Sequence, residues 1–154
     1  GSVLTADLCG VYNRYHANSL RGFYFGDDPP GEMVEQYKRA GGVFEIFKTD
    51  IKAGMTVREV NTRLRSYYED VGIWSETNGW ALGYELGLSL PPDWVGDFYY
   101  HLGDDRYLDR IFEENMVTNF ESLFSTALID TIVYGKNGSR VLSKIPRELI
   151  VVDK

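Results

Sequence analysis

Apolar and polar residues follow two different rhythms along this chain. Residues 3–8 and 11–25 are rich in alternating, β-branched and aromatic positions, which favour extended strands. Residues 32–50 and 57–70 instead carry apolar residues three and four positions apart, the spacing of one helix face. The first half of the chain therefore predicts two strands followed by two helices.

The second predicted helix carries its own start and stop signals. Thr56 precedes Glu59 by three residues, so the Thr56 hydroxyl can accept from the amide of Glu59 while the Glu59 side chain reaches back. Gly72 suits the left-handed conformation in which many helices end. These signals predict a helix between Thr56 and Gly72.

The second half of the chain predicts short strands. Lys-Asn-Gly at 136–138 is typical of a hairpin turn, and residues 95–110 have the polar and aromatic character of a long loop. The predicted strands cover residues 80–90, 116–120, 128–134, 139–143 and 149–152. This order of elements predicts a single α+β domain over residues 1–154, not a doubly wound parallel sheet.

Composition and charge narrow the class of protein. The 154 residues are 44% hydrophobic and 25% charged, which suits one domain with its own core. A net charge of −7 disfavours binding to nucleic acid, whose phosphates would be repelled. No apolar run reaches the roughly 18 residues of a membrane span. We therefore expect a cytoplasmic protein with no nucleic-acid or membrane partner.

The single cysteine, Cys9, cannot form an internal disulfide, so nothing indicates secretion. Because it follows a strand-like run, we expect it to be a small buried side chain. Gly1 and Ser2 resemble residues left by cloning and are set aside from the fold prediction.

Four stretches of sequence carry a resemblance to a known family. They are DLCGVYNRYH at 7–16 leading to Arg21, GYELGLSLPPDW at 83–94, MVTNFE at 116–121, and DTIVYGKNG at 130–138 running on to PREL at 146–149. In this order and at about this spacing they resemble the C-terminal portion of the pita-bread family, which includes methionine aminopeptidase, aminopeptidase P, prolidase and creatinase. Ectoine hydrolases and dimethylsulfoniopropionate lyases form the subgroup that looks most similar. The resemblance implies a partial pita-bread fold, with two helices packed on a curved antiparallel sheet.

That family holds two metal ions with Asp, Asp, His, Glu and Glu ligands. The resemblance aligns Asp7 with the first aspartate and Glu121 with the first glutamate. Asn18, a neutral and weaker ligand, stands at the second aspartate, and Tyr84 stands at the histidine. Ile129, at the last glutamate, has no donor atom. Because only two of the five ligands are kept, we expect no bound metal or other cofactor.

The resemblance also suggests roles for individual residues. If chemistry persists, Asp7, Tyr84 and Glu121 would be its acid and base groups. The expected substrate contacts are His16, Asn18, Trp80, Asp93 and Trp94. Plainer interpretations stay open, because Tyr84 could stack in a filled pocket and His16 could be structural. We favour an ion pair with an acidic neighbour for Arg21.

An aromatic cage is a further possibility. Trp74, Trp80, Tyr84 and Trp94 could surround a quaternary ammonium or sulfonium group through cation–π attraction. A plain aromatic core is the favoured alternative.

The preceding half of a complete pita-bread domain has no counterpart in this chain, so we expect the strands within 3–25 to expose a face or edge. A homodimer, or a partner that supplies the missing half, would cover it. The leading interpretation is a metal-independent small-molecule enzyme, or a binding or assembly module, that takes a small-molecule or peptide ligand. The alternatives are a metal-dependent, peptidase-like hydrolase or lyase acting on a small amino-acid-like or zwitterionic substrate, and a peptide-binding pseudoenzyme.

Overall fold

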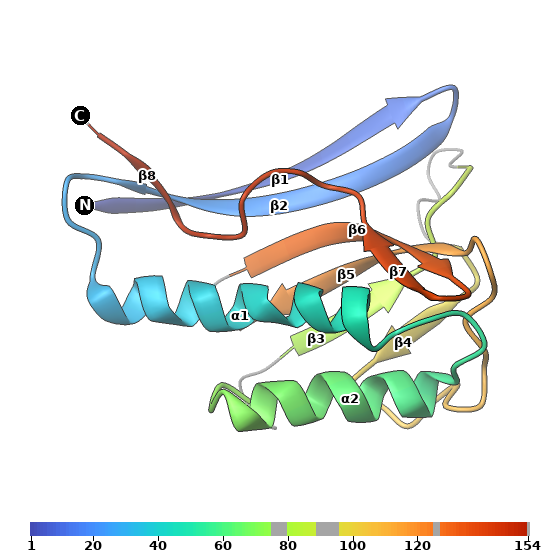
Figure 1. Ribbon diagram of the computed structural model, residues 1–154. Helices are drawn as coiled ribbons and strands as arrows, with labels where there is room; N and C mark the ends of the chain where they lie inside the picture. Colours follow the sequence, from blue (N-terminus) through green and yellow to red (C-terminus); the bar gives the residue numbers. More distant parts are fainter. Residues whose placement is uncertain (75–79, 89–95, 125–126, 154) are drawn as a thin grey trace.

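The computed structural model describes residues 1–74, 80–88, 96–124 and 127–153. In chain order the elements are β1 (Ser2–Tyr12), β2 (Tyr15–Phe25), α1 (Gly31–Thr49), α2 (Val57–Asp70), β3 (Trp80–Tyr84), β4 (Tyr99–His101), β5 (Val117–Leu123), β6 (Ala127–Gly135), β7 (Gly138–Val141) and β8 (Ile150–Val152). The strands form one sheet, and both helices lie on the same side of it (Figure 1). The predicted α+β class is confirmed.

The sheet has the strand order β1-β2-β6-β5-β3-β4, with β7 beside β6 and β8 beside β2. All neighbours are antiparallel except β2 and β8. The ladder between β2 and β6 is a single pair, Leu20 with Ile129. Past that pair β2 leaves β6 and takes β8 as its neighbour at Phe23–Phe25. The β1–β2 hairpin is therefore held to the rest of the sheet over a short length.

The core lies between the helices and the sheet. Phe44 and Phe47 of α1 are fully buried and contact Phe120 of β5, with the Phe47 and Phe120 ring centroids 4.8 Å apart. The helix predictions are confirmed, α2 with the predicted bounds and α1 within one residue at each end. Both halves of the capping box form, since the Thr56 amide donates to Glu59 at 2.8 Å and the Glu59 amide donates to Thr56 at 3.3 Å.

The first hairpin corrects the prediction for residues 3–25. β1 continues through Gly10 to Tyr12, and the turn is formed by Asn13 and Arg14 with φ angles of 49° and 70°. Two positive φ values mark the type I′ turn that matches strand twist, and asparagine tolerates that conformation without glycine. The prediction for Cys9 is also wrong, because β1 is an edge strand and its thiol is exposed.

Two further strand predictions need correction. The predicted loop at 95–110 contains β4, which pairs with β3 from Leu82 to Tyr84. The strand predicted over residues 80–90 is shorter in the structure, because β3 ends at Tyr84. Gly83 permits this packing, because a Cβ built there would lie 2.4 Å from the buried ring of Tyr100. Neither helix in the described part of the chain is long and apolar enough to cross a membrane.

Candidate functional site

One row of side chains crosses the sheet on the face away from the helices. The strand registers join Asp7 to Leu20, Leu20 to Ile129, Ile129 to Glu121 and Glu121 to Leu82. Directly opposed residues point to the same face of a sheet. Phe120 packs on α1, and successive residues alternate between faces, so Glu121 and this whole row point away from the helices.

A hydrogen-bonded network links three strands beside this row. Asn18 Nδ2 of β2 donates a long bond, 3.5 Å, to the hydroxyl of Tyr84 in β3. The Tyr84 amide donates to Asn119 Oδ1 at 2.9 Å, and Asn119 Nδ2 donates to Glu121 Oε1 at 2.8 Å. The network fixes the backbone of Tyr84 relative to the carboxylate of Glu121.

Burial, together with nearby charges, shifts the pKa values of two residues at this site. Burial raises the pKa of Tyr84 to about 12, with further contributions from the Glu121 charge, the hydrogen bond to Glu121 and the Asp7 charge. Burial also raises the pKa of Glu121, and the Asp7 charge adds to that rise while bonds from Tyr84 and Asn119 oppose it. Asp7, Tyr84 and Glu121 therefore lie close enough to interact electrostatically. At neutral pH the phenol stays protonated and serves as a donor to Glu121.

Asn18 contributes an acceptor without a partner. Its Oδ1 atom is buried and makes no hydrogen bond to any described residue. Buried polar atoms nearly always have a partner, so an orphaned one needs an explanation. A ligand donor would satisfy this oxygen.

Ile129 occupies the middle of the row. Only 2% of the residue is exposed, and its cross-strand neighbours are Leu20 on one side and Glu121 on the other. Leu20 and Ile129 therefore lie between Asp7 and Glu121 along the row. The five positions implied by the resemblance therefore present two carboxylates, one amide, one phenol and one alkyl group.

Other predicted contacts lie at the margins of this site. His16 is buried, and both its Nδ1 atom and its amide lie within hydrogen-bonding distance of the Gly87 carbonyl, at 2.9 and 3.2 Å. Trp80 lies on the same sheet face as Tyr84 but is 62% exposed, with its ring edge-on to His101. Asp93 and Trp94 fall outside the described residues.

The structure does not bring Trp74 into a cage with the other rings. Trp74 stacks on Tyr68 and meets Phe124, on the side of the sheet that carries the helices, and Arg65 lies 4.8 Å over its ring. Trp74 is therefore part of the aromatic packing around α2.

Arg21 forms the expected ion pair. Its Nη2 atom lies 2.8 Å from Asp130 Oδ1, and Arg147 Nε lies 2.5 Å from Asp130 Oδ2. Asp130 is fully buried and Arg21 is 3% exposed. The network ties β2 and β6 to the segment before β8, on the opposite face from Ile129. Its role is structural.

Asn119 is a site residue that the sequence reasoning missed. It lies two residues before Glu121 on β5 and contacts both Tyr84 and Glu121. Because residues two apart on a strand share a face, its position relative to Glu121 was the signal that could have found it.

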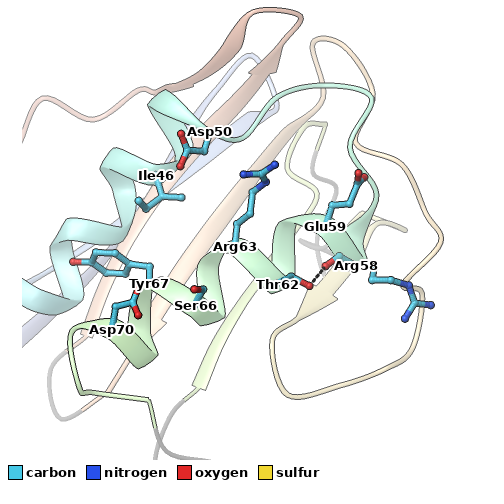
Figure 2. Close-up of a pocket in the computed structure, with 9 residues that line it drawn as sticks. All are labelled: Ile46, Asp50, Arg58, Glu59, Thr62, Arg63, Ser66, Tyr67 and Asp70. Atoms are coloured by element: carbon cyan, nitrogen blue, oxygen red, sulfur yellow. Dashed lines mark hydrogen bonds between the residues drawn. The ribbon is translucent and has the colours of Figure 1, made fainter.

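A separate groove of about 610 Å³ lies between the helices and contains none of these residues (Figure 2). Its charged groups are of both signs, including Asp50, Arg58, Arg63 and Asp70. Arg58 is paired with Asp109 at 3.3 Å. The groove therefore belongs to the helical layer and is remote from the row through Glu121.

Comparison with known proteins supports the assignment of the fold. Residues 1–142 match metallopeptidase family M24. The chain is 27% identical over 150 residues to the ectoine hydrolase of Halomonas elongata, covering 94% of this chain and 36% of that protein. It is 26% identical over 156 residues to the Xaa-Pro dipeptidase of Pyrococcus horikoshii, covering 97% and 42%.

Solved structures show the same architecture. The X-Pro aminopeptidase from Thermotoga maritima matches with a TM-score of 0.76 and 23% identity, over 97% of this chain and 41% of that chain. The prolidase from Pyrococcus horikoshii matches with a TM-score of 0.75 and 25% identity, over 96% and 42%. The chain thus spans about two fifths of the length of these relatives, and the expected partial pita-bread fold is confirmed. The chain belongs to metallopeptidase family M24.

Proposed function

We propose that this chain binds an amine-bearing, amino-acid-like small molecule at the site formed by Asp7, Asn18, Tyr84 and Glu121, without a pair of metal ions. The observation that carries the proposal is that this site has more hydrogen-bond acceptors than donors. Asn18 Oδ1 is buried with no partner among the described residues, beside a half-buried carboxylate at Glu121. An ammonium group supplies several N–H donors and a positive charge, so it can donate to the Asn18 oxygen and also pair with the Glu121 carboxylate.

The donor set argues against the two-metal centre that the family name implies. Within the described residues there is no group of three or more His, Cys, Asp and Glu side chains that could hold a metal ion. Tyr84 keeps its proton at neutral pH because its pKa is about 12, and Ile129 offers no donor. Two carboxylates and a neutral amide are too few for a dinuclear site. We therefore propose that ligand binding here depends on the carboxylates themselves.

Tyr84 would act as an orienting group. Its hydroxyl donates to Glu121, which keeps that carboxylate in place while other lone pairs remain available to a ligand. Asp7, which is exposed on β1, would add a second negative charge at the solvent side of the site. Acid and base roles were expected for Asp7, Tyr84 and Glu121. Of these, we favour the role in which the Tyr84 oxygen keeps its proton.

The relatives indicate which ligands to test first. Their names point to ectoine and Xaa-Pro dipeptides, and we add glycine betaine as a probe that carries positive charge but no N–H donor. Calorimetric titration in the presence of EDTA should show binding of an Xaa-Pro dipeptide and no binding of its N-acetylated form. Betaine binding without dipeptide binding would refute the ammonium proposal.

Matched variants locate the site. Glu121→Gln should weaken dipeptide binding about tenfold or more, since a charge-assisted hydrogen bond contributes about 1.5–3 kcal/mol. Glu113→Gln removes an exposed carboxylate elsewhere and should leave the affinity unchanged. Equal effects of the two substitutions would mean that binding is not at Glu121.

A metal-dependent hydrolase is the second candidate, and membership of a metallopeptidase family favours it. Metal analysis of the purified protein distinguishes the two. One or two equivalents of Mn²⁺, Zn²⁺ or Fe²⁺, lost on Glu121→Gln, would support the hydrolase and refute metal-free binding.

A further inference from the structure

Strand β4 extends the row of side chains that runs through Asp7 and Glu121. Leu82 of β3 pairs with Glu121 on one side and with His101 of β4 on the other. Directly opposed residues share a face of the sheet, so His101 points away from the helices, as Glu121 does. Its neighbour Tyr100 is fully buried on the helical side, which agrees with the alternation of a strand. His101 therefore lies on the face of the candidate site, two strands away from Glu121.

The imidazole of His101 is held in one tautomer. The amide of Gly103 donates to its Nδ1 atom at 2.9 Å, so the proton of the neutral ring is on Nε2. Burial lowers the pKa of His101, while the Asp104 charge opposes this shift and the Arg106 charge adds to it. The ring is therefore neutral at pH 7 and offers one N–H donor, at Nε2. This nitrogen has no hydrogen-bond partner in the part of the chain that the structure describes.

Two aromatic rings hold the imidazole in place. Tyr99 stacks beside it, with the ring centroids 6.5 Å apart, and Trp80 meets it edge-on at 6.0 Å. Tyr99 is two residues from His101 along β4, and Trp80 is two residues from Leu82 along β3, so all three rings share one face. A half-buried donor packed in this way loses little side-chain entropy when it binds a ligand.

The row therefore has opposite polarity at two points. Near Glu121 it presents a carboxylate and the unpartnered oxygen of Asn18, and at His101 it presents a donor. Two strand spacings place about 10 Å between the Cα atoms of Glu121 and His101. A zwitterion of dipeptide size reaches about 7 Å, and a hydrogen bond at each end adds about 3 Å. One small molecule can therefore contact both residues.

We propose that His101 binds the carboxylate of a zwitterionic ligand whose ammonium group lies at Glu121 and Asn18. This inference rests on the proposed function and adds to it the residue that binds the negative end of the ligand. The Nε2–H group donates to the carboxylate with no change in the protonation of the ring. Arg106 is the alternative partner for a carboxylate, but its guanidinium already pairs with Asp104 and its side chain is 71% exposed.

Nitrogen NMR of the free protein tests the direction of the donor. The chain has two histidines, and the signals of His101 are those that disappear in His101→Phe. At pH 8 we expect a protonated Nε2 and an unprotonated Nδ1. A neutral ring with its proton on Nδ1 would overturn the proposal, because Nε2 would then be an acceptor.

Two ligands that differ only in the carboxylate test the binding role. An Xaa-Pro dipeptide carries this group, and the corresponding aminoacyl-pyrrolidine has a hydrogen in its place. In calorimetric titrations with EDTA, the unmodified chain should bind the dipeptide about tenfold more tightly, the contribution of one charge-assisted hydrogen bond. His101→Phe keeps a flat ring between its neighbours but has no donor. It should bind the two compounds about equally, with an unchanged affinity for the aminoacyl-pyrrolidine.

Arg106→Gln is the matched control, and it should keep the tenfold preference for the dipeptide. A preference that survives His101→Phe, or that disappears in Arg106→Gln instead, would overturn the assignment of His101. Equal binding of the two compounds by the unmodified chain would also overturn it, and would leave the proposed ammonium site intact. If neither compound binds, the proposed function and this inference are both refuted.

Discussion

The buried carboxylate of Asp130 gives the strongest stability prediction. Asp130 is fully buried, and it accepts from Arg21 at 2.8 and 3.1 Å and from Arg147 at 2.5 Å. Asp130→Asn keeps the shape of the side chain but leaves the Arg21 guanidinium, 3% exposed, without its counter-charge. Removing one partner of a buried ion pair costs about 3–5 kcal/mol, because the remaining charge stays desolvated. For a chain of this length that corresponds to a melting temperature about 6–20 °C lower.

Thermal and urea unfolding, followed by circular dichroism at fixed protein concentration, measure this loss. Asp97→Asn is the matched control, because it removes the same charge from a pair with Arg110 in which the Asp97 side chain is 97% exposed. The control should unfold within error of the unmodified chain, since exposed pairs contribute little. A loss for Asp130→Asn below about 1 kcal/mol would refute the reasoning, because it would mean that Arg21 can reach water once the carboxylate is gone.

Three further predictions concern the site strands. Gly83→Ala should lower the free energy of unfolding by about 1–3 kcal/mol, because its Cβ would meet the buried ring of Tyr100 at 2.4 Å. Gly10→Ala is the control and should leave the stability unchanged, because a Cβ there has no atom within 4 Å. The urea midpoints of the two variants measure the difference. Glu121→Gln should be more stable than the unmodified chain near pH 8, because the raised pKa of Glu121 means that its ionised form is disfavoured by folding. This difference in stability should shrink as the pH falls through the pKa of Glu121 in the folded protein toward about 4. Urea midpoints measured over a series of pH values test this, and a difference that does not depend on pH would contradict it. Tyr84→Phe should remove one phenol that titrates near pH 12 from the ultraviolet titration, and loss of a phenol titrating near pH 10 instead would contradict the burial of Tyr84.

The helices and the last hairpin could be predicted because their signals are local. Thr56 and Glu59 mark a helix start by a bond between neighbours in sequence, and Lys-Asn-Gly at 136–138 marks a turn in the same way. The first turn was missed because Asn13 and Arg14 adopt positive φ without a glycine, while Gly10 lies within the strand. The ends of strands β1 and β2 depend on which of their residues pair with each other, and a short stretch of sequence does not show this pairing.

The site could be predicted only in part, for a similar reason. The family pattern indicated Asp7, Tyr84 and Glu121, and the structure brings them within electrostatic reach of one another. The unpartnered oxygen of Asn18 depends on the register between three strands, so it could not be predicted from the sequence. The position of Trp74 could not be predicted for the same reason, because its stacking on α2 depends on how the helices pack against the sheet.

The alternation of β6 connects the site to the ion network behind it. Ile129 points into the row between Asp7 and Glu121, while the next residue, Asp130, points to the helical side and binds two arginines. A third acid at position 129 would leave three carboxylates in one row, a charge that favours divalent cations. With isoleucine there, the row holds two carboxylates, one exposed at Asp7 and one half-buried at Glu121. Under the proposed function, a single ammonium group would balance the half-buried charge of Glu121 and leave the exposed charge of Asp7 to water, so isoleucine at position 129 fits the proposed organic cation better than a metal pair.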